Sequence, residues 1–101
     1  MVTKTKKEVA GLWLRDVPPD KVFWFHDGRM VKNLNELATT LREMPEETFH
    51  YHVTGDKNDF SNWVRNVIGD VTLANQLQKA TAQATAARRV EMRLNWLRAR
   101  L

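Results

Sequence analysis

The hydrophobic and polar positions in the middle of the chain follow the period of a helix. Apolar residues recur at i, i+3, i+4 and i+7 as Phe60, Trp63, Val64 and Val67, and this spacing predicts one apolar helix face. Asn58 and Asp59 precede the run and can accept the unpaired N–H groups of a first helical turn. Gly69 can adopt the left-handed conformation that ends a helix, and Asp70 can cap the next one. Residues 58–77 therefore predict one helix, a stop and the start of another.

A second helical pattern occupies the C-terminal third. From Thr72 to Leu101 there is no Gly or Pro, and apolar residues follow one another at intervals of three or four. They are Leu73, Leu77, Ala80, Ala84, Ala87, Val90, Leu94, Leu97 and Leu101. The pattern predicts a single helix of roughly 45 Å, longer than a small core requires. The alternative is a bend or break within residues 79–85, KATAQAT, because threonine is a mediocre helix former.

Strand-forming residues stand nearer the N-terminus. Val22 to Phe25 are four consecutive β formers, Asp27–Gly28 suits a two-residue turn, and Met30–Val31 begins a return strand. These features predict a small β-hairpin. An isolated hairpin is marginal in water, so helices must cover it.

Two further helices are predicted between the hairpin and residue 58. Asn33 can cap a helix that runs to Met44, and Glu36 occupies the capping-box position. Its apolar face consists of Leu34, Leu37, Ala38 and Leu41. Pro45 ends that helix and suits the first turn of another. Residues 48–54, TFHYHVT, fit a strand or a helix, and the preceding Pro-Glu-Glu favours the helix.

Residues 1–19 are predicted to be a flexible tail, because TKTKKE is polar and Pro18–Pro19 stops any regular element. Four apolar residues inside it form a strap over the core or, alternatively, a docking motif: Val9, Leu12, Trp13 and Leu14. Residues 20–101 are predicted to form a single compact domain. Its fold class is α+β, mainly α-helical, with the hairpin, three to four helices and an extended C-terminal helix.

Charge and composition narrow the classes of partner and compartment. The chain has 101 residues, no cysteine and a net charge of +4. Residues 71–101 carry six Lys or Arg against one Glu, so they hold a charge of +5 and the rest of the chain −1. This asymmetry indicates an anionic partner for the last helix. The absence of cysteine fits the cytoplasm, and no apolar run approaches the ~20 residues that span a bilayer.

Four short motifs resemble a family of small archaeal and bacterial domains of unknown function. They read F-x-F-x-D-G-x-x-x-x-N-L-x-E-L from Phe23, E-T-F-x-x-H-V from Glu47, N-D-F-x-x-W-V from Asn58 and V-x-G-D-x-x-L-A from Val67. The resemblance covers roughly residues 22–98 and leaves the tail outside. It implies one compact domain and brings no known activity.

Histidine and carboxylate groups are candidates for chemistry. His26, His50 and His52 could bind a metal with Asp27, Asp56 or Asp59, but an H-x-H pair converges on one ion only in a strand. We therefore expect no metal and no cofactor. A possible pocket comprises His52, Asn58, Asp59 and Trp63, in which Asp59 would orient the imidazole as a general base requires. No Ser or Cys nucleophile accompanies it, and helix caps explain Asn58 and Asp59 without chemistry.

The C-terminal helix is the stronger functional candidate. Its anionic-partner residues are predicted to be Arg88, Arg89, Arg93, Trp96, Arg98 and Arg100, because Arg binds phosphate in a bidentate way and Trp can stack on bases. Its association face is predicted to be Val90, Leu94, Leu97 and Leu101. Solvated helix faces also carry such charges, and a basic amphipathic helix on an anionic membrane is a third alternative.

These observations favour a non-enzymatic, cytoplasmic binding module that associates with itself or with another protein through the last helix. The alternative is a nucleic-acid- or ribosome-binding protein that uses the same basic residues. We do not expect a membrane surface as the partner.

Overall fold

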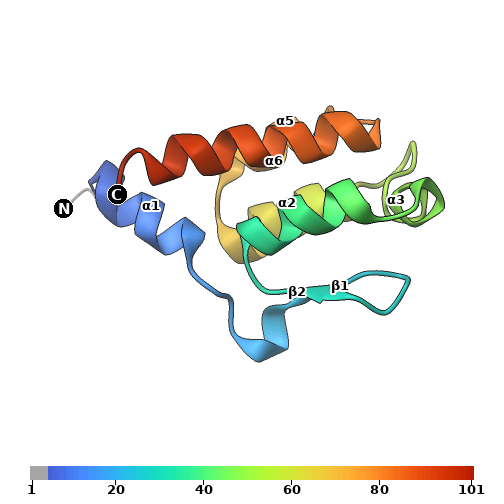
Figure 1. Ribbon diagram of the computed structural model, residues 1–101, viewed down its shortest axis with the longest axis horizontal. Coiled ribbons are helices and arrows are strands. Elements are labelled where there is room, and N and C mark those ends of the chain that lie inside the picture. Colours follow the sequence, from blue (N-terminus) through green and yellow to red (C-terminus); the bar gives the residue numbers. More distant parts are fainter. Residues whose placement is uncertain (1–4) are drawn as a thin grey trace.

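The computed structural model describes residues 5–101 and is built mainly from helices (Figure 1). Residues 1–4, which belong to the predicted tail, lie outside the described part. The elements in chain order are α1 (Lys6–Leu14), the 3-10 helix η1 (Pro19–Lys21), β1 (Phe23–Trp24), β2 (Met30–Val31), α2 (Leu34–Glu43), α3 (Glu46–His52), α4 (Asp59–Trp63), the π-helix η2 (Val64–Ile68), α5 (Val71–Gln78) and α6 (Gln83–Arg98). The predicted class, mainly helical with an N-terminal hairpin and a long last helix, is confirmed.

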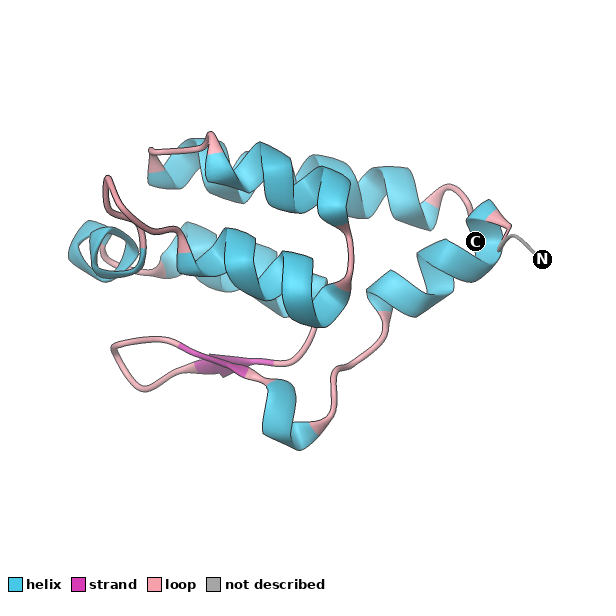
Figure 2. Cartoon of the chain, turned by 180° about the vertical axis from the view of Figure 1, so that it is seen from behind, coloured by secondary structure: helices cyan, strands magenta, loops and turns pink. Residues whose placement is uncertain are grey.

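The helices lie in layers, with the hairpin on one side and α6 on the opposite side (Figures 1 and 2). α6 packs most extensively against α2, and α5 packs on both α4 and α6. One cluster of buried side chains joins these layers, and Phe49, Phe60, Leu34 and Leu97 are among its largest members. No helix in residues 5–101 combines the length and the apolar character needed to cross a membrane.

The predicted hairpin is confirmed, but its loop is one residue longer than expected. Phe23 pairs with Val31 and Trp24 with Met30, and the Phe25 N–H donates to Arg29 at 2.8 Å. Three residues, 26–28, therefore form the loop. A two-residue turn of the type that suits Asp-Gly needs positive φ at both positions, whereas here only Gly28 has it, with φ 93°. This geometry matches a type I turn followed by a left-handed glycine.

The predicted caps form around the middle helices. The Asn33 side chain accepts from the Glu36 N–H at 2.8 Å, and the Asn58 side chain accepts from the Ser61 N–H at 3.0 Å. Gly69 has φ 96°, and the Asp70 carboxylate accepts from the Leu73 N–H. Residues 46–52 are helical, as the preceding Pro-Glu-Glu favoured. The sequence did not predict the π-helical turn before Gly69.

The prediction of one continuous helix from Thr72 is wrong, and the alternative break is confirmed. α5 ends at Gln78 and α6 begins at Gln83. Side chains of α4 and of its cap donate to carbonyls of α5. Ser61 Oγ donates to the Ala74 carbonyl, and Asn58 Nδ2 donates to the Leu77 carbonyl. The break turns α6 back onto α2 and α5, so that the apolar faces of both helices are buried within one chain.

A helix occupies part of the predicted tail. Thr5 caps α1 by accepting from the Glu8 N–H, and α1 packs against α6 and α2. Ala10 and Val17 are buried in the common core. Of the four predicted strap residues, Trp13 and Leu14 pack against this core. The boundary at residue 19 and the flexibility of the segment stay predictions.

Candidate functional site

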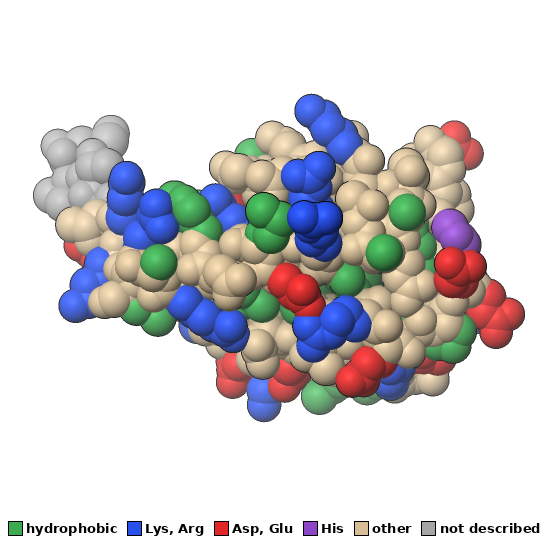
Figure 3. Space-filling view, turned by 45° about the horizontal axis from the view of Figure 1, so that its top comes forward, with side chains coloured by type: hydrophobic (Ala, Val, Ile, Leu, Met, Phe, Trp, Pro, Cys, Tyr) green, Lys and Arg blue, Asp and Glu red, His purple; other side chains and the backbone are tan. Residues whose placement is uncertain are grey.

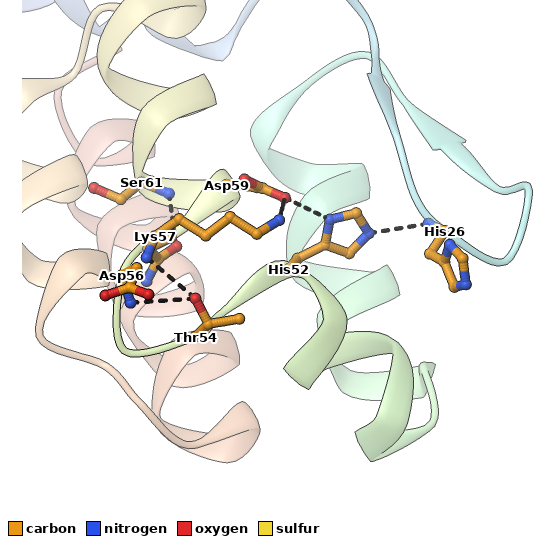
Figure 4. A network of polar contacts seen from close by, with 8 residues as sticks. His26, His52, Thr54, Asp56, Lys57, Asp59 and Ser61 are labelled. Carbon is orange, nitrogen blue, oxygen red and sulfur yellow. Dashed lines mark hydrogen bonds and ion pairs between the residues drawn. The ribbon is translucent and has the colours of Figure 1, made fainter.

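The predicted pocket around His52 is a closed hydrogen-bond network (Figure 4). His52 lies in α3 and is buried. Its Nε2 accepts the backbone N–H of His26 at 2.9 Å, and its Nδ1 lies 2.9 Å from Asp59 Oδ2. Because an N–H faces Nε2, the proton must sit on Nδ1, which donates to the carboxylate. Both ring nitrogens are thus occupied, and neither is free to bind a metal or accept a substrate proton.

The two other members of the predicted pocket have structural partners. Asn58 caps α4 and donates to the Leu77 carbonyl, while Trp63 Nε1 donates to the Lys21 carbonyl at 2.8 Å. Within residues 5–101, no three His, Asp or Glu side chains are grouped so that they could hold a metal ion. The exposed His26 instead stacks on Tyr51, with ring centroids 3.8 Å apart. The network joins the hairpin loop to α3 and α4.

Two carboxylates near the hairpin loop have lowered pKa values. Burial raises the pKa of Asp59, but hydrogen bonds from Lys57 Nζ at 2.9 Å and from His52 outweigh it, so the pKa lies below its usual range. The Arg29 guanidinium, which donates to Asp27 at 2.8 Å, lowers the pKa of Asp27. Both groups therefore stay ionised to a lower pH than an unperturbed aspartate.

The association face predicted on the last helix is buried against other helices of the same chain. Val90 and Leu97 have no exposed surface, and Leu94 is 3% exposed. All three lie on the side of α6 that joins the core, where α2 is the main neighbour. Leu101 alone among the four predicted residues is exposed. A partner, or a membrane, could reach the other three only if the fold opened.

Arg93 also has a structural partner. Its Nε and Nη2 donate to the two carboxylate oxygens of Asp70 at 2.7 and 2.9 Å, and Asp70 has no exposed surface. The guanidinium carbon lies 4.4 Å from the Trp96 ring centroid and 5.7 Å from that of Trp13 in α1. Arg93 therefore links α6 to the start of α5 and to α1, and it is not available to an anionic partner.

The remaining arginines of the last helix are not neutralised. Glu91, the acidic residue of this segment, pairs with Arg42 of α2. Arg88, Arg89, Arg98 and Arg100 form no ion pair within residues 5–101. Arg98 donates to Asn35, and Arg100 lies 3.5 Å from the Trp96 ring centroid and donates to the Trp96 carbonyl.

The outward face of α6 combines these charges with exposed apolar groups. Arg88 and Arg89 are exposed, Met92 is 57% exposed and Trp96 is 39% exposed. Their spacing places them on one face, opposite the buried Val90, Leu94 and Leu97. Lys and Arg side chains recur along this side of the molecule (Figure 3). We call Arg88, Arg89, Met92 and Trp96 the outward face of α6.

Two hollows border this face and share Ala84 and Arg88. A hollow of about 640 Å³ lies between α2 and α6 and is lined by Leu41, Arg42, Glu46, Gln83, Ala84, Ala87, Arg88 and Glu91. A second hollow of about 420 Å³ is lined by Ala84, Thr85, Arg88, Arg89 and Met92. Because the side chains of Ala84 and Ala87 are small, the surface is recessed between the larger polar side chains around them.

Comparison with models of protein families identifies the family of this chain. The model of DUF5752, a family of unknown function, matches residues 21–95. The chain belongs to this family. The DUF5752 match includes Arg88, Arg89 and Met92, whereas α1 with Trp13 and the terminal residues Trp96, Arg98, Arg100 and Leu101 lie outside it. Searches among curated proteins and among solved structures gave no match.

Sequence reasoning missed Met92, Ala84 and Glu46 at this surface. Met92 follows Arg89 by three positions and Arg88 by four, which is a helical spacing on the polar side of this DUF5752 chain. The apolar stripe on the opposite side of the same helix is the stronger pattern and masks this one. Glu46, at the start of α3, lines the hollow because α6 packs beside α2, which no local pattern encodes.

Proposed function

We propose that this protein is a non-enzymatic binding module that holds a protein partner, or a second copy of itself, on the outward face of α6. One observation carries the proposal. Arg88 and Arg89 have no ion-pair partner within residues 5–101 and stand beside the exposed Met92 and Trp96. Unpaired Arg next to exposed Met and Trp is the composition of protein interfaces.

The hollows favour a protein over nucleic acid. A phosphate backbone needs a track of cations, but the larger hollow has an apolar floor at Leu41 and Ala87 and is bordered by the carboxylates of Glu46 and Glu91. A base stacked on the Trp96 face that Arg100 covers would have to displace that guanidinium. Both features suit side chains of a protein better than phosphates and bases.

The closed His52 network supports a role without catalysis. A general base needs a ring nitrogen that faces the substrate, and His52 uses one for the His26 N–H and the other for Asp59. We also assign the protein to the cytoplasm, which agrees with a chain that has no cysteine.

Site-specific photo-crosslinking tests the proposal. A photoreactive phenylalanine at position 92, in cells that make the protein, should give discrete protein adducts that mass spectrometry identifies, including an adduct of the chain with itself. The same group at exposed position 72, at the start of α5, is the matched control and should give none. Arg88→Glu with Arg89→Glu should remove the adducts. Adducts that persist in this double variant, or that arise equally from position 72, would refute the proposal.

Nucleic acid or the ribosome is the second candidate, and the four arginines without ion pairs in residues 88–100 favour it. Anisotropy of labelled RNA and duplex DNA at low and physiological salt tests it. Binding that weakens steeply with salt and disappears in Arg88→Ala with Arg89→Ala would support this candidate. Absence of binding at low salt would exclude it.

A further inference from the structure

The rim of the α2–α6 hollow carries two charges of opposite sign that have no ion-pair partner in the described part of the chain. Arg42 and Glu91 line the hollow and pair with each other, so together they are neutral. The other two charged groups are Arg88 on α6 and Glu46 at the start of α3. Neither forms an ion pair within the described residues, and both are exposed. One positive and one negative group thus border the same hollow, on different elements.

A surface with this arrangement is complementary to itself. A two-fold axis brings the same patch of two copies together, so that residue i meets residue j and residue j meets residue i. A two-fold axis that passes midway between these two groups would set each Arg88 opposite the Glu46 of the other copy. A partner with only acidic groups would leave Glu46 facing a like charge, and a purely basic partner would do the same to Arg88. The charges of the rim therefore fit a second copy of this chain.

The floor of the hollow suits close contact between helices. Leu41 and Ala87 are buried, Ala84 is exposed, and the hollow measures about 640 Å³. Small residues on a helix let another backbone or side chain approach closely, and covering the exposed Ala84 side chain removes apolar surface from water. Met92, one helical turn beyond Arg88, adds a flexible apolar side chain beside the rim.

We propose that two copies of this chain associate about a two-fold axis through the α2–α6 hollow, with Arg88 of each copy paired to Glu46 of the other. This proposal rests on the proposed function, since it names the partner of the α6 surface. It explains why an apolar hollow on a small helical protein is bordered by balanced charges rather than by charges of one sign.

Charge-swap variants of the full chain test the pairing. Sedimentation velocity should give a wild-type mass near twice the 11.8 kDa of one chain. Glu46→Arg alone and Arg88→Glu alone each replace two attractive contacts by two repulsive ones, and should weaken dimerisation by at least about tenfold. An equimolar mixture of the two single variants should dimerise like wild type, because every facing pair is again of opposite sign. The double variant should dimerise as well.

Two control variants test whether the loss of dimerisation is specific to Arg88 and Glu46. Glu43→Arg and Lys79→Glu make the same charge changes at exposed positions that line neither hollow, and should leave dimerisation unchanged. A circular dichroism spectrum of each variant confirms that it folds. A monomeric wild type at 100 μM, or a dimer that both single variants leave intact, overturns the proposal, as does a mixture that fails to dimerise. If the chain is monomeric but position 92 still crosslinks to another protein, only the dimer fails and the proposed function stands.

Discussion

The buried Asp70–Arg93 pair allows a quantitative test of how α6 is held. The carboxylate has no exposed surface, the Arg93 side chain is 11% exposed, and two short hydrogen bonds join them. Asp70 also accepts from the Leu73 N–H at 3.2 Å as the cap of α5. Breaking a buried ion pair by removing one member costs about 3–5 kcal/mol, and loss of a cap costs about 1 kcal/mol.

We therefore expect Asp70→Ala to lower the free energy of unfolding by about 4–5 kcal/mol, since the two losses overlap in one side chain. Asp70→Asn keeps a good capping group, so its cost should be smaller by about 1 kcal/mol. Arg93→Met should also be costly, because it leaves a carboxylate buried without its cation. Combining Asp70→Asn with Arg93→Met removes both charges and should cost clearly less than the sum of the single variants.

Urea unfolding followed by far-ultraviolet circular dichroism measures these differences. With a slope of about 1–3 kcal/mol per molar urea, the Asp70→Ala midpoint should fall by about 1.3 M or more. Stability comparisons need equal slopes, so the slope of each variant is the internal control. A loss of only about 1 kcal/mol in Asp70→Ala would mean that Asp70 acts merely as a cap, and additive costs in the double variant would show that the two charges are not coupled.

Three further predictions concern the core and the His52 network. Leu94→Glu places a carboxylate at a position that is 3% exposed, so it should unfold the chain, with a loss of more than about 4 kcal/mol in urea unfolding, rather than yield a folded monomer. Long-range ¹H–¹⁵N spectra of His52 should show a protonated Nδ1 and a bare Nε2, and a proton on Nε2 would disprove the His26 contact. The pKa of Asp59 is lowered in the fold, so its contribution to stability is present above the unfolded value of about 3.9 and is lost as pH falls through the lower folded value. Asp59→Asn should therefore lose less stability than wild type on acidification below about pH 4 in urea titrations, and parallel losses would contradict this.

Local sequence patterns were sufficient to predict most of the helices and their ends. Caps at Asn33, Asn58 and Asp70 depend on side chains within three residues of the N–H groups that they accept, so the sequence alone locates them. The stop at Gly69 follows from its freedom to take positive φ. The helical periods of α2 and α6 likewise follow from residues three and four apart.

The parts that the sequence could not predict depend on contacts between distant residues. The break after α5 is stabilised when Ser61 and Asn58 donate to carbonyls more than ten positions along the chain. The sequence pattern predicts that Arg93 is a surface cation, whereas in the fold it donates a hydrogen bond to the buried Asp70. An apolar stripe such as that of Leu94 fits an internal contact as well as an external one, and only the position of α2 decides between them.

Dilution of ¹⁵N-labelled protein tests most directly whether two copies of the chain associate through α6. Amide shifts recorded between about 500 and 10 μM, a span set by the micromolar affinities of small interfaces, should change with concentration at Ala84, Arg88 and Met92. The hairpin residues Trp24 and Met30, which are also exposed, should stay constant. Constant amide shifts throughout α6 over this range, with or without changes in the hairpin, would contradict association through α6.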